Sequence, residues 1–271
     1  MTAAFRPGAR LAELGRRLHL SAMAPPANQT PSPYPTTRHS LVAAAGASDA
    51  ERRRTAVDAL IRLYWRPAYG RLRLKWGLQP ADAEDLVQEF FAGLLDGGVF
   101  AGYDPQRARF RTYLRSCLDH FAAKAQRGER RLKRGGGAAH LPLDFAGAER
   151  ELDQAESPDA DARFDREWVR ALLSHGVEEL RAQTLGTARE VRFRVFECYD
   201  LFPAQESARP GYRDIAARLD IPVTQVTNHL AWARRELRRL VLARLAEVTG
   251  SDAELRDEAE ELFGGSRDDV A

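Results

Sequence analysis

Apolar residues recur at helical spacing in two long blocks of this sequence, and strand signals are scarce throughout. The first block runs from about residue 48 to 134, and the second from about 167 to 248. The segment between them is rich in Gly, Pro and acidic residues, which is the composition of a linker. The pattern therefore predicts an all-α protein in which two helical domains are joined by a flexible linker.

These signals divide the chain into five parts. Residues 1–36 are predicted to be a disordered leader, because a stretch rich in Pro, Thr and Ser follows an Arg-rich start. Residues 37–134 form the first helical domain, and residues 135–165 form the linker. Residues 166–249 form the second domain. Residues 250–271 are an acidic C-terminal extension, which we expect to be a solvated end; a cover for a basic helix and a site for a regulator are the other interpretations.

Charge is unevenly distributed, although the formal net charge is only +2. Residues 105–134 hold ten Lys or Arg against two acids, whereas residues 247–271 hold nine acids against two Arg. This is typical of a protein that meets a polyanion at one place. Cys117 and Cys198 are too few for a disulfide framework and are predicted to be small core residues. No apolar run is long enough to cross a membrane, so we expect a cytoplasmic protein.

Residues 81–95 predict a helix with one acidic and one apolar face. Asp82, Asp85 and Glu89 share a face at about 100° per residue. Three interpretations stay open: a solvated face near a helix N-terminus, a catalytic or metal-binding carboxylate group, and a docking face for a basic partner. The enzymatic interpretation, a metal-dependent nuclease or recombinase, is the weakest, because no second acidic cluster or His pair lies nearby to complete a metal site.

An aromatic and basic helix is predicted to follow, over residues 110–134. Its apolar stripe is expected to be mostly core, but Tyr113 is flanked by Arg109, Arg111 and Arg115 and is expected at the solvent boundary. Cations beside an accessible ring suit single-stranded nucleic acid, because the cations follow the phosphates and the ring stacks on a base.

The pattern of residues 212–241 is typical of a helix-turn-helix. Ile215, Ala216 and Leu219 face a tight turn at 220–222, and a longer helix then repeats apolar residues on one face. The opposite face is predicted to meet DNA, with polar side chains reaching bases and Arg side chains reaching phosphates. The residues predicted to make these contacts are Thr224, Gln225, Asn228, Trp232, Arg235, Arg238 and Arg239.

The order of these elements resembles a bacterial sigma factor of the extracytoplasmic-function (ECF) type, in a branch with a long linker and a C-terminal extension. The resemblance rests on "DAEDLVQEFFAGLL", "ARFRTYL" and "RRLKRGGG", with "TRHSLVAAAG" and "LYWRPAYGRLR" upstream, and covers about residues 37–263. It implies a sigma region 2-like helical bundle and a sigma region 4-like helix-turn-helix. It also implies a non-enzymatic transcription initiation factor whose partners are RNA polymerase core enzyme and promoter DNA, with an anti-sigma factor or other regulator as a further candidate partner. No cofactor, metal, membrane or small-molecule substrate is expected.

Residue by residue, the resemblance implies three sites. Core polymerase would be bound by Asp82, Glu84, Asp85, Gln88 and Glu89. The minus-ten element would be melted and read by Arg109, Phe110, Arg111, Tyr113, Arg115, His120, Lys124, Arg127, Arg130, Arg131, Lys133 and Arg134. The minus-thirty-five element would be read by the helix-turn-helix residues given above.

Several positions depart from the usual ECF pattern. Tyr113 and His120 stand where Trp and Asn are usual, and Asp220 replaces a turn Gly. Asp tolerates a left-handed backbone better than most residues, so we expect the turn to form. The alternative function is a free-standing helix-turn-helix regulator, which would leave the segments at 82–95 and 109–134 unexplained.

Overall fold

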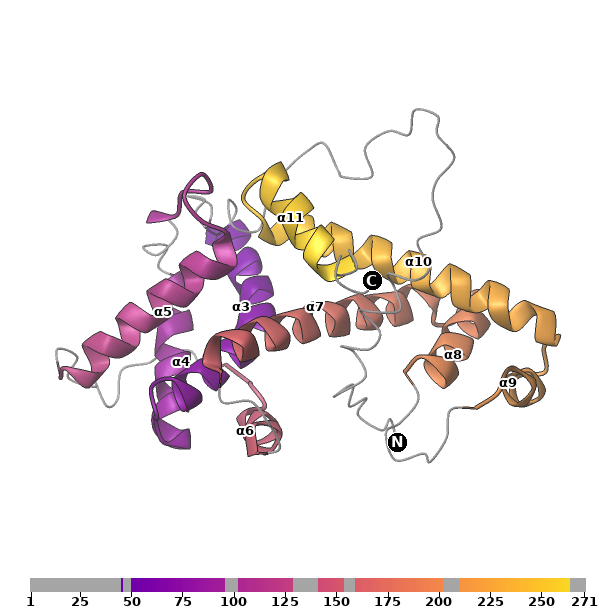
Figure 1. The fold of residues 1–271 in the computed structure, drawn as a ribbon, viewed down its shortest axis with the longest axis horizontal. Helices are drawn as coiled ribbons and strands as arrows, with labels where there is room; N and C mark the ends of the chain where they lie inside the picture. The colour runs from indigo at the N-terminus through magenta and orange to yellow at the C-terminus, as the bar shows by residue number, and fades with distance from the viewer. Residues whose placement is uncertain are drawn as a thin grey trace, which may run out of the picture. The chain divides into compact units, whose positions relative to one another are not determined.

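The computed structural model describes residues 45, 50–95, 102–128, 141–153, 159–201 and 210–263. These residues form nine α-helices and no strand, as the sequence predicts for an all-α protein (Figure 1). No helix within the described ranges is both long and apolar enough to cross a membrane. The predicted leader at 1–36 and the end of the basic run at 129–134 lie outside the described residues.

Internal contacts divide the chain into two units. Among the described residues, the first unit comprises those within 45–171 and 247–255, and the second comprises those within 172–246 and 256–263. The division falls inside helix α7 (Ala160–Thr184), beyond the end of the predicted linker.

The first unit is built around α3 (Ala50–Leu74), which contacts α4 (Pro80–Leu95), α5 (Phe110–Gln126) and α6 (Phe145–Asp153). Large aromatic side chains fill its core. The ring of Tyr64 lies 5.8 Å from the ring of Phe110 and 6.4 Å from that of Trp168 on the first half of α7. All three side chains are at most 1% exposed. Burial of such rings is the main stabilising contribution to a small helical core.

Part of the predicted linker is folded against this core. Residues 145–153 form α6, where Phe145 lies edge-on to Trp65 at a centroid distance of 5.4 Å. Tyr69 donates a hydrogen bond of 2.7 Å to Glu149, and Arg73 also binds that carboxylate. The composition of the segment predicted a flexible tether, but a single apolar ring and a few acids suffice here because α3 supplies the complementary aromatics and arginines.

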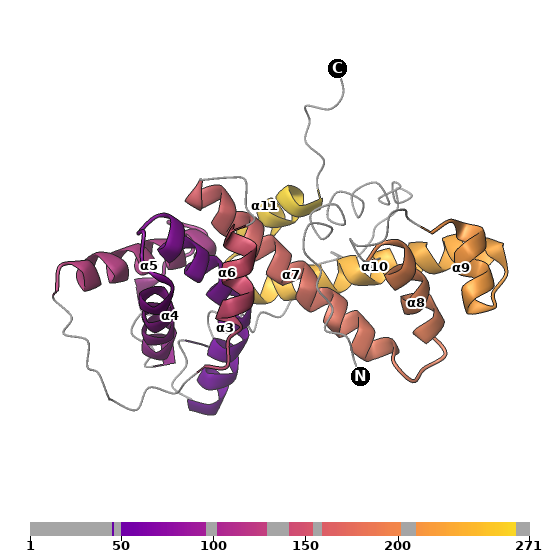
Figure 2. The same ribbon diagram turned by 90° about the horizontal axis from the view of Figure 1, so that it is seen from below.

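The second unit contains the rest of α7 together with α8 (Glu190–Tyr199), α9 (Tyr212–Leu219) and most of α10 (Val223–Val248) (Figure 2). Helices α7 and α10 approach closely at Gly176, where an added Cβ would lie 2.7 Å from Val241 Cγ2 and 3.0 Å from Leu237 Cδ1. A side chain at this position would push the helices apart, so glycine sets their spacing.

The acidic C-terminal extension contains α11 (Asp252–Phe263). Leu255, Ala259 and Phe263 are buried on one face of this helix, and Glu254 and Glu258 are also buried. This differs from the expectation of a solvated end. The many acids suggested full exposure, but the apolar residues recur at i and i+4 and give the helix a face that packs.

Candidate nucleic-acid interface

Helix α4 presents the acidic face that the sequence predicted. Its apolar residues Val87 and Phe91 are fully buried against the core, and this fixes the rotation of the helix. Asp82, Asp85 and Glu89 consequently point to solvent and are exposed, while Glu84 is half-buried. This face can therefore meet a basic surface without any rearrangement of the core.

Gln88 differs from the other residues predicted to bind polymerase. Its side-chain amide donates a 3.1 Å hydrogen bond to the carbonyl oxygen of Leu141, and its side-chain oxygen accepts a 2.9 Å bond from the Leu141 N–H. The Gln88 side chain thus both donates to and accepts from the main chain of the predicted linker. Its half-buried side chain holds residue 141 beside α4 and is engaged within the protein.

Tyr113 on α5 lies at the boundary with solvent, as predicted. Its side chain is half-buried, and its ring lies 5.3 Å from that of Tyr103 in the loop that precedes α5. Burial, together with a hydrogen bond to Cys117, raises the pKa of Tyr113 to about 12, so the hydroxyl is neutral at physiological pH. A neutral, partly accessible ring with a second ring beside it can stack on an unpaired base.

Phe110 departs from the prediction that it contacts DNA. Its side chain is fully buried, and its ring lies edge-on to both Tyr64 and Tyr103. Leu114, one turn further along, is also buried. The aromatic pattern of this segment therefore contains one ring at the surface, Tyr113, and residues of the core. Positions 110, 114 and 118 form the buried stripe of α5, which packs on α3 and α4.

Two of the arginines predicted to follow the DNA backbone are covered by α7. The Arg111 guanidinium lies 4.6 Å from the Trp168 ring centre, and its Nη1 lies 3.5 Å from Asp165. Arg115 Nη1 lies 3.7 Å from Asp161 and 4.0 Å from Asp165. Only 12% of the Arg111 side chain is exposed, so it is a packing residue in this conformation.

The exposed cations of this helix lie further along it. His120, Lys124 and Arg127 are exposed, whereas Arg109 at the start of α5 is half-buried. Arg130, Arg131, Lys133 and Arg134 lie outside the described residues. Tyr113 and the exposed cations therefore lie on one helix, with the ring near its start and the charges near its end.

Asp119 anchors this helix to α3, and sequence reasoning did not identify it. Its carboxylate accepts hydrogen bonds of 2.8 Å from Arg71 Nε and Nη2, and bonds of 2.9 Å from Lys75 and from the indole N–H of Trp76. Burial alone would raise the pKa of Asp119, but the hydrogen bonds from Arg71, Lys75 and Trp76 outweigh it and hold the pKa well below its ordinary value. The anion therefore fixes the orientation of α5.

In the second unit, α9 and α10 are consecutive helices joined by a short turn at residues 220–222, where the sequence predicts the turn of a helix-turn-helix. Asp220 adopts the left-handed conformation expected for the turn, with φ 51° and ψ 52°. Ile215 on α9 and Leu230 on α10 are both buried. The face of α10 opposite Leu230 is exposed from the first turn of the helix to its middle. Thr224, Gln225, Asn228, Arg235 and Arg239 are exposed on that face.

The other two residues predicted to bind the minus-thirty-five element are partly engaged. The Arg192 guanidinium lies 5.0 Å from the Trp232 ring, and the Arg238 guanidinium lies 4.5 Å from the ring of Phe263 in α11. Both Trp232 and Arg238 are half-buried. Each therefore contributes to packing of the second unit, while the five exposed residues named above form the polar face of α10.

Arg234 and Asp200 form an anchor that the sequence did not reveal. Arg234 Nε and Nη2 each donate a 2.9 Å hydrogen bond to the Asp200 carboxylate, whose side chain is fully buried. This pair ties the end of α8 to α10. The signal in the sequence was slight, since Arg234 is one of five arginines between residues 234 and 244 and nothing local distinguishes it.

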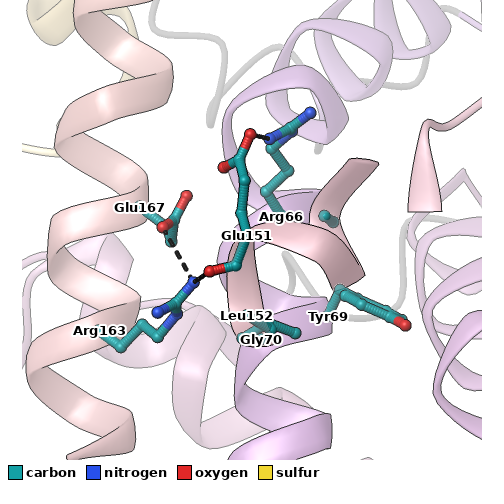
Figure 3. A pocket seen from close by; sticks show the side chains of 8 residues that line it. Arg66, Tyr69, Gly70, Glu151, Leu152, Arg163 and Glu167 are labelled. Carbon is teal, nitrogen blue, oxygen red and sulfur yellow. Dashed lines mark hydrogen bonds and ion pairs between the residues drawn. The ribbon is translucent and has the colours of Figure 1, made fainter. Parts of the chain in front are cut away.

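A small pocket lies among α3, α6 and α7 and is lined in part by Arg66, Tyr69, Glu151 and Arg163 (Figure 3). Arg163 donates a 3.2 Å hydrogen bond to the carbonyl oxygen of Glu151, and its Nη2 lies 3.6 Å from Glu167. The bond to Glu151 holds α6, which follows the basic run in the sequence, against α7. Within the described ranges, no group of three or more His, Cys, Asp or Glu side chains is arranged to hold a metal ion.

The segment from α3 to α5 is similar to a known protein family. Residues 57–132 match the family model described as Sigma-70 region 2. The match supports a sigma factor with a role in promoter recognition and transcription initiation, and such a role implies RNA polymerase core enzyme and promoter DNA as partners. No curated protein and no solved structure matches the chain. The sigma region 2 segment contains both the acidic face of α4 and the Tyr113 face of α5.

Proposed function

We propose that this protein is a sigma factor of the ECF type that acts in the cytoplasm. It binds RNA polymerase core through the acidic face of α4, opens and reads the minus-ten element with α5, and reads the minus-thirty-five element with α9 and α10. It performs no bond chemistry itself, since the polymerase does so. The observation that carries the proposal is the pairing, within the sigma region 2 segment, of an exposed acidic helix face with a half-exposed tyrosine.

The acidic face supports docking to a basic surface. Asp82, Asp85 and Glu89 follow one another along a helix whose other side is fixed in the core, so their carboxylates form a rigid negative strip. Opposite charges across such a surface mainly accelerate association and select the partner. Because the strip is exposed, its effect should also weaken as the salt concentration rises.

Helix α5 supports strand opening. Extruding a base costs a few kcal/mol of stacking and pairing, and stacking on a protein ring returns part of that cost. The Tyr113 ring is partly exposed and already packs beside the Tyr103 ring, so little ordering is needed when a base arrives. His120, Lys124 and Arg127 can then hold the phosphates of the same DNA.

A binding assay with purified core polymerase tests the proposal and separates it from its rival. A free-standing helix-turn-helix regulator need not bind the core enzyme, whereas a sigma factor must. We expect the double charge reversal Asp85→Lys and Glu89→Lys to weaken core binding. Asp58→Lys, an exposed change on α3, should leave it nearly unchanged and serves as the control. Absence of core binding by the unaltered protein would overturn the proposal. If the protein does bind, run-off transcription on a promoter library would identify its promoter.

A further inference from the structure

Glu254 of the C-terminal extension is buried within the first unit, although it belongs to the most acidic part of the chain. Only 6% of the residue is exposed. Its Oε1 accepts a 2.7 Å hydrogen bond from the Phe110 N–H, and its Oε2 accepts bonds from the Gly250 N–H at 2.7 Å and from the Tyr103 hydroxyl at 3.2 Å. One carboxylate thus joins the C-terminal segment to the first residue of α5 and to the loop before it.

Helix α5 depends on this carboxylate for its start. Arg109, the N-cap residue, makes no side-chain capping bond, and the Phe110 N–H is buried. A buried N–H in the first turn needs an acceptor, because leaving it unsatisfied is costly. Glu254, which is 144 positions away in the sequence, supplies the acceptor that a local Ser, Thr or Asp would normally provide. Its negative charge also suits the helix N-terminus.

The same segment fixes the Tyr103 ring, against which Tyr113 lies. Gly250 packs so tightly here that an added Cβ would overlap the Tyr103 hydroxyl and would lie 2.8 Å from Pro105 Cβ. The rings of Tyr103 and Tyr113 are 5.3 Å apart, and the rings of Tyr103 and Phe110 are 5.2 Å apart. Gly250 and Glu254 therefore set the position of the ring that packs beside Tyr113.

We propose that Glu254 is a positioning residue for promoter opening, and that residues 250–254 are part of the strand-opening apparatus. The inference rests on the proposed function and deepens it. The matched family segment ends at residue 132, yet the start of α5 is completed by a residue beyond 250. Glu254 does not touch DNA; it acts by holding the first turn of α5 and the Tyr103 ring, so that Tyr113 is preorganised to receive a base.

The test measures strand opening by full-length protein with core polymerase. The probe is a duplex promoter selected with the unaltered protein and carrying 2-aminopurine in the minus-ten element, and a copy with a pre-opened bubble serves for comparison. Glu254→Ala removes all three hydrogen bonds that the carboxylate accepts. We expect it to slow opening of the duplex about tenfold or more, since the loss of a single hydrogen bond to a charged group already corresponds to about tenfold. Transcription from the bubble copy should stay close to that of the unaltered protein, because the bubble bypasses opening.

Further variants separate positioning from general instability. Gly250→Ala keeps the carboxylate but displaces the segment, and it should reproduce the selective defect on the duplex. Tyr103→Phe removes one bond and keeps the ring, so its defect should be smaller. Glu260→Ala removes an exposed charge from the same helix and should behave as the unaltered protein.

The outcomes are distinct. Equal losses on duplex and bubble would show a merely structural role and would overturn the inference. An unchanged or faster opening by Glu254→Ala would also overturn it, the faster rate indicating that the C-terminal segment obstructs DNA. If the unaltered protein opens no promoter with core polymerase, the proposed function itself fails.

Discussion

Replacing Asp119 with alanine is expected to destabilise the first unit more than any change to its exposed ion pairs. Arg71, the main partner of this carboxylate, has a side chain that is only 3% exposed and donates a 2.8 Å hydrogen bond to each carboxylate oxygen. Its Nη1 also donates to Asp161, which is a largely exposed residue. The variant therefore leaves a buried guanidinium with one partner at the surface and leaves the Trp76 indole N–H without its carboxylate.

The expected loss is about 3 kcal/mol in the free energy of unfolding. Removing one partner of a buried ion pair typically costs about 3–5 kcal/mol, and the lower end applies because Asp161 still compensates part of the Arg71 charge. Lys75→Ala is the matched control, since it removes another donor to the same carboxylate. The Lys75 side chain is 44% exposed, so its loss should cost below about 1 kcal/mol.

The effect should also depend on pH. The pKa of Asp119 is lowered in the folded protein, so its contribution is fully present above the unfolded value of about 4 and is lost as the pH falls toward the folded value. The difference between the unaltered protein and Asp119→Ala should therefore shrink on acidification from neutral pH to about pH 3.

Urea unfolding followed by tryptophan fluorescence provides the measurement. Trp65, Trp76 and Trp168 lie in the first unit and only Trp232 lies in the second, so the signal reports mainly on the unit in question. The reasoning would be refuted if Asp119→Ala lost no more stability than Lys75→Ala. It would also be refuted if the stability difference between the unaltered protein and Asp119→Ala did not shrink in acid.

Three further predictions concern the other sites. Tyr113→Ala should impair formation of the strand-separated promoter complex more than initial duplex binding, measured by 2-aminopurine fluorescence and by gel shift; equal losses would argue against a role in opening. Arg235→Ala should reduce the slope of log binding constant against log salt by about one, as expected for one phosphate contact, and an unchanged slope would remove this residue from the interface. Asp200→Ala should destabilise the second unit by about 3 kcal/mol in thermal unfolding, because it leaves Arg234 without its fully buried partner. Arg194→Ala, which breaks the exposed pair with Glu190, is the control, and an equally small loss in Asp200→Ala would contradict the prediction.

Much of the candidate site was predictable from local patterns. The acidic face of α4 followed from helical spacing, because the apolar residues opposite it could only face a core. The turn at 220–222 followed from the apolar pattern on either side of it, and the left-handed residue followed from the family resemblance, in which a turn Gly is usual where Asp220 stands. The exposure of Thr224, Gln225 and Asn228 followed in the same way from the buried positions of their neighbours.

Other parts of the site were not predictable in this way. Phe110 and Arg111 both read as DNA contacts, yet one is core and the other stacks on Trp168. Asp161 and Asp165 are spaced i and i+4 at the start of α7, a signal of one acidic helix face, but nothing local indicated that this face would meet the arginines of α5. A helical wheel gives the direction of a side chain about its own axis and no information about which element covers it.

The C-terminal segment shows most clearly which features depend on local sequence and which depend on the tertiary structure. Ser251 and Glu254 have the spacing of a capping box, and Ser251 Oγ does accept the Glu254 N–H at 3.1 Å. By itself the sequence determined the helices, their apolar faces and the turn of the helix-turn-helix, because these depend on residues a few positions apart. Only the tertiary structure decided that the Glu254 carboxylate caps α5, because a charged group that leaves water binds the buried donors that the fold places within its reach, however distant they are along the chain.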